Sequence, residues 1–450
     1  MILFMLKGKY REVLTLCFVF CFFLVWSLLV LPINLDEIWN YGFSYAIALG
    51  EVPYLDFNLV ITPFFSIFMA FFLYIFGNNI LVFNIVFALI FTGMFYILLK
   101  LIDEKIYVIL FFLTFPLAVL FPSYNLFLLF GYFLLIYLEK NNGNDYFIGL
   151  VLAILIMTKQ TVGLMLVLPS LYYWKRKDKI FKRFVGCSIP IIAMILYLYF
   201  SKAIIQFFDL CFLGLFDFAT GNGKTFNIFV LLTLIFAMFD IYFIVKDKKN
   251  IYNYYFLAFV SMAIPLFDLY HFELVFVAFL VLLFMNYDIN IKLNLPLFFL
   301  VTMFGFAFIV IDYRTDSGKL RFSKKLSHFE TRLVTESYID KVNSINKLAD
   351  KYSSKKIVFI SADGYFYKII NNLKIDYLDL INTGNHGYDG SKKLLNKIKN
   401  CSNCVFFVNP DEYGKGKQSD QAVLKYVIDT GDLLENSGEY YVYEIKSKDK

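Results

Sequence analysis

Residues 14–45 read LTLCFVFCFFLVWSLLVLPINLDEIWNYGFSY. The apolar run from Leu14 to Leu35 ends at two acids, Asp36 and Glu37, and an aromatic stretch follows them. A helix needs about 20 apolar residues to cross a bilayer, so the run predicts a membrane span. Three basic residues between positions 7 and 11 precede it, and cytoplasmic flanks are rich in Lys and Arg. We therefore expect a cytoplasmic N-terminus, a retained signal anchor and the acidic pair at the outer mouth of the span.

The composition indicates a polytopic membrane protein and excludes a single soluble core. The chain has 450 residues, of which 60% are hydrophobic and only 17% charged, with a mean hydropathy of +0.65. Ordinary soluble domains are about half apolar and a quarter charged. The net charge is a modest +6, and basic residues gather in short loops at 175–177 and 246–249. That placement is typical of membrane topology and not of nucleic-acid binding.

The apolar pattern predicts about eleven membrane spans. Ten are continuous runs: 13–33, 63–77, 80–99, 106–121, 124–138, 184–200, 226–245, 253–267, 272–286 and 295–312. The segment 146–173 is apolar on both sides of Thr158-Lys159-Gln160. The basic loops at 175–183 and 246–249 should both be cytoplasmic. With a cytoplasmic N-terminus, that requires the segment 146–173 to cross once, as a broken helix.

This topology predicts two domains in a cell-membrane protein. A transmembrane domain covers 1–312, with a first outer loop at 34–62 and a second at 201–225. The remainder, 313–450, is polar, with strand-like runs at 357–360, 375–378, 405–408 and 440–443 and helical patterns between them. Alternating strands and helices predict a small α/β domain. The fold class is therefore a polytopic α-helical membrane protein with an extracytoplasmic C-terminal α/β domain.

Three carboxylates on the first outer loop are candidates for catalysis. Asp36 and Glu37 either cap the helix that follows the first span, or supply a general base near a site shielded from water. Asp56 lies further along the loop in Gly50-Glu51-Val52-Pro53-Tyr54-Leu55-Asp56-Phe57. It is either a turn residue after Pro53 or a second carboxylate on the same outer face.

The candidate cations lie far from the acids in sequence. Lys159 stands in an apolar segment, where it either snorkels to the interface or pairs with a lipid phosphate. His271 lies at the outer junction of two spans, beside Asp268; it is either an interfacial histidine next to a capping acid or a donor to a phosphate or leaving group. Lys224 is either a surface lysine or a loop cation that faces the site.

Other motifs are few. Cys401-Ser402-Asn403-Cys404 is the one close cysteine pair in the sequence, and it predicts either a structural disulfide or two inert thiols. The sequence has no phosphate-binding glycine loop, nucleophile elbow or HExxH zinc motif. The sequence therefore has no motif that would bind a nucleotide on the cytoplasmic side.

The order of the motifs resembles the GT-C glycosyltransferase superfamily, including its protein O-mannosyltransferase and aminoarabinose-transferase branch. An acidic pair follows the first span, then Gly50-x-x-Pro53-Tyr54-x-Asp56-Phe57, a proline that opens the next span, and Met157-Thr158-Lys159 before an apolar run and a basic loop. The resemblance covers 10–200 in motif order, is weaker over 201–312 and is only architectural after 313. Ile61-Thr62 stands where the aminoarabinose branch often has a basic residue.

The resemblance implies a sugar donor on a polyprenyl phosphate at the outer leaflet. Asp36 would be the catalytic base, with Glu37 beside it and Asp56 orienting the sugar or acceptor. The implied contacts to lipid phosphate or sugar are Lys159, Gln160, His271, Asp268, Lys224 and Tyr54. The reaction would be a single displacement with inversion. Some members hold a divalent metal at the acidic pair; no metal and no other cofactor is predicted here.

The expected function is transfer of a sugar from that donor to an extracytoplasmic acceptor, namely a cell-wall glycan, teichoic acid, lipid or protein. The expected partners are this donor, the acceptor and membrane lipids, with no nucleic acid. Alternatives are a polysaccharide polymerase, a lipid-linked glycan flippase or a transporter. A polymerase typically has a large loop between late spans, whereas most of the polar sequence here is C-terminal. A transporter would show paired broken helices in two halves.

Overall fold

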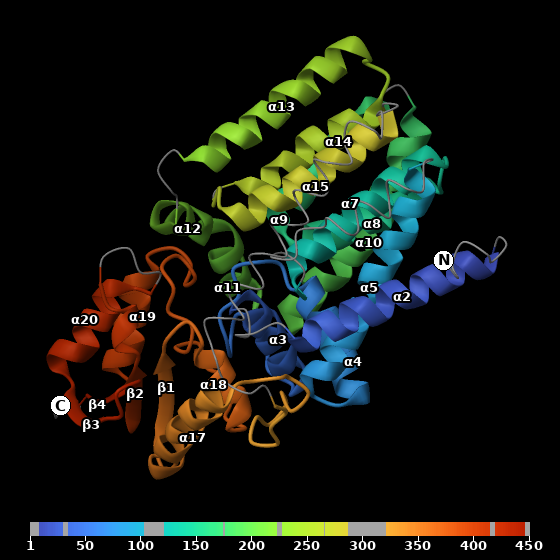
Figure 1. The fold of residues 1–450 in the computed structure, drawn as a ribbon. Helices are drawn as coiled ribbons and strands as arrows, with labels where there is room; N and C mark the ends of the chain where they lie inside the picture. Colours follow the sequence, from blue (N-terminus) through green and yellow to red (C-terminus); the bar gives the residue numbers. More distant parts are fainter. Residues whose placement is uncertain are drawn as a thin grey trace. The chain divides into compact units, whose positions relative to one another are not determined.

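The computed structural model describes residues 9–29, 35–102, 121–173, 176–222, 227–264, 266–286, 321–414 and 419–445 (Figure 1). The chain divides into two compact units. Unit 1 is Met1–Leu28, Asn84–Met194 and Lys224–Ser317, and unit 2 is Leu29–Phe83, Ile195–Gly223 and Gly318–Lys450. The predicted boundary at 312/313, the span 295–312 and all but the last residue of the span 106–121 lie outside the described residues.

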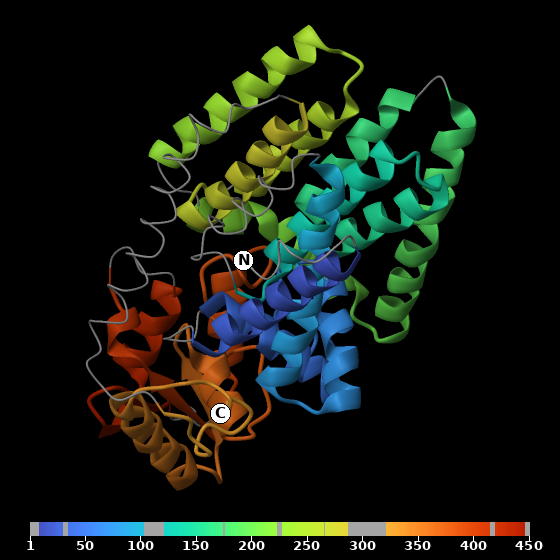
Figure 2. The ribbon, with the colours of Figure 1, turned by 45° about the vertical axis from the view of Figure 1, so that its right-hand side comes forward.

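Unit 1 consists of apolar helices. Its described helices are α2 (Lys9–Leu29), most of α5 (Ile80–Leu101), α7 (Tyr124–Lys140), α8 (Asp145–Thr158), α9 (Gln160–Val167), η2 (Leu168–Tyr173), most of α10 (Lys177–Phe200), α13 (Ile228–Lys246), α14 (Ile251–Phe259), η4 (Val260–Ala263) and α15 (Leu269–Asn286). In the described part of the chain α5, α10 and α13 are long and apolar enough to cross a membrane. Helices α13, α14 and α15 lie side by side (Figure 2). The ring of Phe236 stacks on Phe279 at 4.6 Å.

The segment 145–173 is a hairpin, so the prediction of one broken helix that crosses once is wrong. Helix α8 ends at Thr158, and α9 turns back along it. The two helices pack so closely that a Cβ on Gly163 would lie 2.3 Å from Ile156 Cα. Both ends of the hairpin reach Arg183: its Nε is 2.8 Å from Asp145 Oδ1 and its Nη1 is 3.5 Å from Ser170 Oγ. The apolar pattern could not reveal this reversal, since a broken helix and a tight hairpin have the same hydropathy pattern.

The predicted span at 63–77 forms the short helix α4 (Phe64–Phe76) in unit 2. Thirteen residues span about 20 Å, less than the roughly 30 Å hydrocarbon core. Both flanks are held inside unit 2: Tyr54 donates to the Ile61 carbonyl at 2.9 Å, and Ile80 N donates to the His328 carbonyl at 2.9 Å. Both ends of α4 are therefore held by contacts within unit 2.

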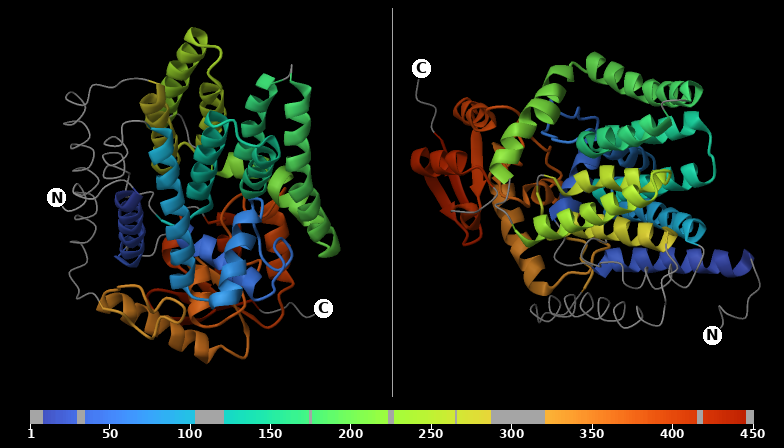
Figure 3. Two further views of the ribbon diagram at one scale, coloured as in Figure 1. Left: turned by 90° about the vertical axis from the view of Figure 1, so that its right-hand side faces the viewer. Right: turned by 90° about the horizontal axis from the view of Figure 1, so that it is seen from above.

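The C-terminal part of unit 2 is a small α/β fold (Figure 3). Its four-stranded sheet has the order β1-β2-β4-β3, from β1 (Lys356–Ile360), β2 (Cys404–Val408), β3 (Asp432–Asn436) and β4 (Tyr441–Glu444). Strands β1 and β2 are parallel, and the other two pairings are antiparallel. The helices around it are α17 (Glu336–Lys351), α18 (Gly364–Ile370), α19 (Gly390–Lys399) and α20 (Gln421–Thr430). Cys401 forms a disulfide with Cys404, the first residue of β2.

Two details of the sheet differ from the prediction. The run 375–378 is a turn rather than a strand, because Asp379 Oδ2 accepts from Asp376 N at 2.7 Å and Asp376 Oδ1 accepts from Leu378 N at 3.0 Å. Side chains thus replace the ladder bonds that a strand would make. Strand β3, of sequence DLLEN, was not predicted, since it is an exposed edge strand with little apolar alternation.

The two predicted outer loops pack on this α/β fold within unit 2. The first contains α3 (Leu35–Ala48), and the second contains α11 (Ile204–Phe208), η3 (Asp209–Leu213) and α12 (Gly214–Asn222). Trp39 Nε1 donates to the Ala362 carbonyl at 2.8 Å, and Asn58 Nδ2 donates to the Leu380 carbonyl at 2.8 Å. Lys393 of α19 forms an ion pair with Asp209. Three segments far apart in sequence therefore build one compact body.

Candidate active site

The acidic pair lies in the first turn of α3, and its two members have different surroundings. The Glu37 side chain is 1% exposed and forms an ion pair with Arg332, whose side chain is 0% exposed. Burial raises the pKa of Glu37, and the guanidinium of Arg332 opposes that rise. Asp36 is only half-buried, one position earlier on the helix. The charge of Glu37 is thus balanced by Arg332 inside the fold. Asp36 is the more exposed of the two carboxylates.

Arg332 is a residue that the sequence did not single out. It lies 295 positions after Glu37, in a segment without helix or strand. No local pattern marks it, because its role depends on a contact between the first outer loop and the C-terminal fold. A buried arginine is nevertheless unusual unless it is paired, and that rule identifies it once burial is known.

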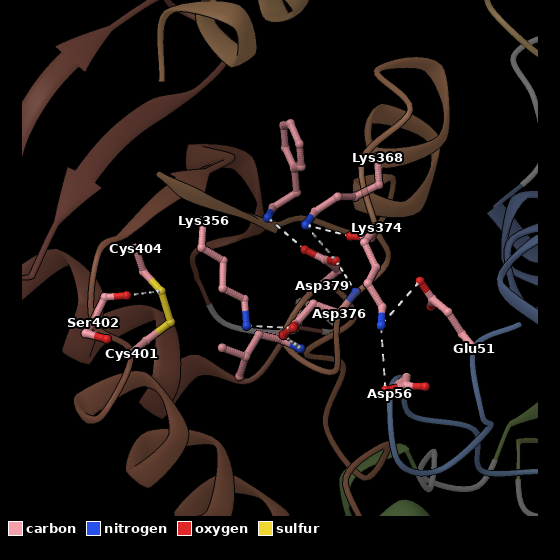
Figure 4. A network of polar contacts seen from close by, with 12 residues as sticks. Glu51, Asp56, Lys356, Lys368, Lys374, Asp376, Asp379, Cys401, Ser402 and Cys404 are labelled. Carbon is pink, nitrogen blue, oxygen red and sulfur yellow. Dashed lines mark hydrogen bonds and ion pairs between the residues drawn. A yellow bond between two sulfur atoms is a disulfide. The ribbon is translucent and has the colours of Figure 1, made fainter. Parts of the chain in front are cut away.

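Asp56 is a turn residue, as one of its two predicted alternatives had it, and it also contacts a lysine (Figure 4). Its Oδ2 accepts a hydrogen bond from Val52 N at 2.7 Å, which closes the turn around Pro53. Its Oδ1 lies 3.7 Å from Lys374 Nζ, which is also 4.0 Å from Glu51 Oε1. Burial raises the pKa of Glu51 to about 7, and Lys374 opposes that effect. Glu51 and Lys374 are further titratable groups beside a predicted site residue.

The network continues into the α/β fold. Lys368 Nζ donates to the Lys374 carbonyl at 3.1 Å and lies 3.2 Å from Asp379 Oδ2. Asp379 is fully buried, and this burial raises its pKa to about 6. Figure 4 shows the ammonium of Lys374 directed at Glu51 and Asp56, with Lys368 behind it. This chain of charges couples the turn at Asp56 to the strand end at β1.

Tyr54 is a packing residue in this structure. It is 1% exposed, has φ +73° and donates its hydroxyl to the Ile61 carbonyl at 2.9 Å. Its ring meets the ring of Phe207 at 5.3 Å. It therefore joins the two outer loops, and its hydroxyl is already used inside the first.

Lys159 stands at the tip of the α8–α9 hairpin in unit 1. Its extended backbone (φ −150°, ψ 105°) ends one helix and begins the next, and Gln160 follows as the buried first residue of α9. Lys159 Nζ lies 3.2 Å from Asn125 Oδ1 and 5.7 Å from the centre of the Tyr124 ring. The ammonium is thus placed against the N-terminal turn of α7.

The turn at 268–271 reaches the same helix end. His271 Nδ1 lies 2.8 Å from Asp268 Oδ1, which also accepts from His271 N at 2.9 Å. The neighbouring Tyr270 hydroxyl is 2.7 Å from Ser123 Oγ, the N-cap of α7. Since Ser123 and Asn125 are two positions apart, the structure brings Lys159 and the turn at His271 to one end of unit 1. A helix N-terminus between two such groups is suited to an anion.

The predicted site residues therefore form two groups. Unit 2 holds Asp36, Glu37, Tyr54 and Asp56, and unit 1 holds Lys159, Gln160, Asp268 and His271. Lys224 lies outside the described residues. Convergence of the two groups on one cavity stays a prediction.

Comparison with known proteins gives a fold. No family model matches the chain, and no curated protein sequence matches it. The crystal structure of ArnT from Cupriavidus metallidurans bound to undecaprenyl phosphate superposes with a TM-score of 0.55 at 11% identity, over 96% of this chain and 97% of that one. The apo form of the same protein gives 0.52 at 10% identity, over 97% of each chain. The resemblance seen in the motif order is confirmed at the level of the fold.

Proposed function

We propose that this chain is a membrane glycosyltransferase that moves a sugar from a polyprenyl-phosphate donor to an extracytoplasmic acceptor. The observation that carries the proposal is the contrast within α3, where Glu37 is buried in an ion pair with Arg332 and the adjacent Asp36 is half-buried. The fold shared with ArnT, which was crystallised with undecaprenyl phosphate, supports this donor class. The acceptor would be a cell-wall glycan, teichoic acid, lipid or protein.

Asp36 is the general base in this proposal. It removes the proton from an acceptor hydroxyl, whose oxygen attacks the anomeric carbon from the face opposite the phosphate. The bond from that carbon to the phosphate oxygen breaks, and its electron pair leaves with the polyprenyl phosphate. One displacement of this kind inverts the anomeric centre. General-base catalysis contributes about 10²–10⁴ in rate.

The leaving phosphate needs positive charge, and the group in unit 1 supplies it in this proposal. Lys159 contacts Asn125 in the first turn of α7, and Tyr270, which precedes His271, contacts the N-cap Ser123; the N-terminus of a helix favours an anion. Charge that develops on the departing phosphate is stabilised most by donors already in place. Glu37 has a positioning role, since its ion pair with Arg332 holds the start of α3 against the C-terminal fold.

In this proposal the site faces the outer side of the cell membrane. The N-terminal span has its basic flank on the other side. The disulfide between Cys401 and Cys404 supports an oxidising compartment for the C-terminal fold. A donor that carries its own phosphate leaving group suits the outer side of the membrane, because it needs no nucleotide there.

Transfer by the full-length protein in proteoliposomes, supplied with a panel of undecaprenyl-phosphate sugars and acceptor glycans, tests the proposal. Asp36→Asn should lower kcat at least about 100-fold and leave the affinity for undecaprenyl phosphate unchanged. Asp340→Asn, which removes an exposed carboxylate of α17, is the matched control and should behave as wild type. Equal transfer by wild type and Asp36→Asn would rule out this base.

Lys159→Met separates donor binding from proton transfer. The variant should weaken binding of undecaprenyl phosphate about tenfold or more. Lys248→Met, in an exposed basic loop, is its control. Unaltered lipid binding by Lys159→Met would remove this lysine from the phosphate site and leave the role of Asp36 standing.

A further inference from the structure

Helix α4 of unit 2 is apolar on all of its faces and yet is largely exposed (Figure 1). Its sequence, FFSIFMAFFLYIF, contains no charged residue. One face is buried and includes Phe65, Met69 and Leu73. The opposite face has four large exposed side chains near its C-terminal end: Phe71, Tyr74, Ile75 and Phe76. A helix that is apolar all round belongs in a protein core or in a membrane, so this exposed face requires an apolar surrounding.

The second outer loop has the same feature in another form. Its acids are directed at the α/β fold: Asp209 Oδ1 accepts a hydrogen bond from Tyr388 N at 3.1 Å. Asp217 Oδ2 accepts one from Asp389 N at 2.7 Å. The large hydrophobic side chains that the loop leaves exposed are Ile205, Phe208, Leu213 and Phe216. A helix that faces water has the reverse arrangement, with its apolar side packed and its acids in solvent.

Both exposed faces begin close to a membrane span in the chain. Helix α4 ends at Phe76 and α5 begins at Ile80. Helix α10 ends at Phe200 and α11 begins at Ile204. A chain of four residues reaches at most about 14 Å, and both α5 and α10 are long and apolar enough to cross a membrane. The end of α4 and the start of α11 therefore lie near a membrane surface.

The α/β fold of the same unit has no comparable face among its described residues. Over 321–445 the large hydrophobic side chains that are exposed lie in loops or on the edge strand β3, namely Phe322, Tyr388, Tyr413, Leu433 and Leu434. Scattered exposed hydrophobic residues are normal, whereas a contiguous patch marks an interaction site. The interaction surface of unit 2 is therefore on its two outer loops.

The chemistry of the two faces selects lipid as the partner. Aromatic side chains are enriched where a protein meets the membrane–water interface, and a tyrosine there keeps its hydroxyl at the level of the head groups. Tyr74 is 78% exposed, and its neighbours on the face are Phe71, Ile75 and Phe76. The exposed face of α4 carries no charge that a polar protein surface could complement.

We propose that the C-terminal half of α4 and the exposed side of α11–α12 lie in the bilayer interface and seat unit 2 on the membrane, in contact with lipid acyl chains. This lipid contact does not rest on the proposed transferase function. Helix α3 packs on α4. If both proposals hold, the seat therefore also sets the height of Asp36 relative to a lipid phosphate.

Spin labelling of the full-length protein in phosphatidylcholine liposomes tests the proposal without transfer. Phe71→Cys, Ile75→Cys and Phe208→Cys, each in a background without other free cysteines, carry a nitroxide. A nitroxide among acyl chains collides with oxygen, which is apolar, and one in water collides with a polar nickel chelate. All three labels should prefer oxygen. Leu433→Cys, on the exposed edge strand of the same unit, is the matched control and should prefer the chelate.

A charge placed in the seat gives a second measurement. Ile75→Glu should abolish the oxygen preference of a label at Phe71 and should leave thermal unfolding in detergent unchanged, because Ile75 is 52% exposed. The labels at Phe71 and Phe208 decide the matter even where Ile75→Glu does not fold.

Two results would overturn the seat. Labels that meet the chelate as freely as the control would place these faces in water. Labels shielded from both reagents, with spin–spin broadening between molecules, would assign the faces to a second copy of the chain. Either result leaves the transfer assay of Asp36→Asn to stand by itself, and an oxygen preference without any transfer overturns the proposed function alone.

Discussion

Removal of the Arg332 guanidinium should destabilise unit 2 far more than removal of a surface arginine. The side chains of Arg332 and Glu37 are 0% and 1% exposed. Arg332→Met leaves the Glu37 carboxylate buried without its cation. Breaking such a pair from one side costs about 3–5 kcal/mol, whereas replacing both charges by apolar groups is often close to neutral.

The comparison is with Arg321, which pairs with Glu336 at 3.0 Å while the two side chains are 49% and 61% exposed. Exposed pairs contribute about 0–1 kcal/mol. For a folding unit of roughly 200 residues, each kcal/mol moves Tm by about 2–4 °C. Arg332→Met should therefore lower Tm by about 6–20 °C, and Arg321→Met by less than about 4 °C.

Thermal unfolding in detergent, followed by the fluorescence of Trp39, measures this difference. Trp39 lies in unit 2 and donates to the Ala362 carbonyl. The other two tryptophans, Trp26 and Trp174, are replaced by Phe in every protein compared, so that Trp39 reports alone.

The double variant Glu37→Leu/Arg332→Met should recover at least half of the lost Tm. Since burial raises the pKa of Glu37, and loss of the cation raises it further, the deficit of Arg332→Met should grow as pH rises and shrink as the carboxyl protonates. An Arg332→Met protein that melts like Arg321→Met, or a double variant no better than the single, would refute the buried pair.

Three further outcomes follow from the structure. Burial raises the pKa of Glu51 to about 7 from an ordinary 4.5, so the wild-type protein should lose stability as pH rises from about 4.5 through 7. The Glu51→Gln variant should show no such fall in Tm and should melt at a higher temperature than wild type at pH 8. A Cβ on Gly149 would lie 2.1 Å from the Arg183 carbonyl oxygen, whereas one on Gly93 would meet nothing closer than 3.5 Å; Gly149→Ala should cost about 1–3 kcal/mol and Gly93→Ala should not destabilise, as thermal melts will show. Single cysteines at Asn142 and Tyr172, in a background without other free cysteines, should react with an impermeant maleimide from the same side of the membrane, since the hairpin between them returns; labelling from opposite sides would restore a single crossing.

The candidate site was predictable in its residue types but not in its division of roles. Asp36 and Glu37 are adjacent in sequence and look equivalent there. The structure separates them, because a helix turns successive side chains by about 100°: Glu37 is buried in an ion pair with Arg332, and Asp36 is half-buried. The contacts of Asp56 with Lys374 and of Lys159 with Asn125 likewise join residues that no local pattern links.

Errors in the predicted topology came from segments in which two folds share one hydropathy pattern. An apolar run of 13 residues reads the same in an interfacial helix and in part of a span, and α4 proved to begin and end within unit 2. A lysine within an apolar segment reads the same in a broken helix and in a hairpin. In α8 and α9 the reversal is possible because Gly163 lets the two backbones touch at Ile156.

The sequence by itself determined the class of protein, the helical character of most of its length, the α/β fold at its C-terminus and the acidic pair at the start of the first outer loop. Those conclusions depend on local quantities: hydropathy over about 20 residues, charge beside each span and alternation along a strand. Only the tertiary structure decided that Glu37 is neutralised by Arg332, that 145–173 doubles back and that α4 and the second outer loop keep apolar faces exposed. Each of these three features depends on burial and on contacts between residues far apart in the chain. Burial and long-range contacts are not encoded in any short window of residues.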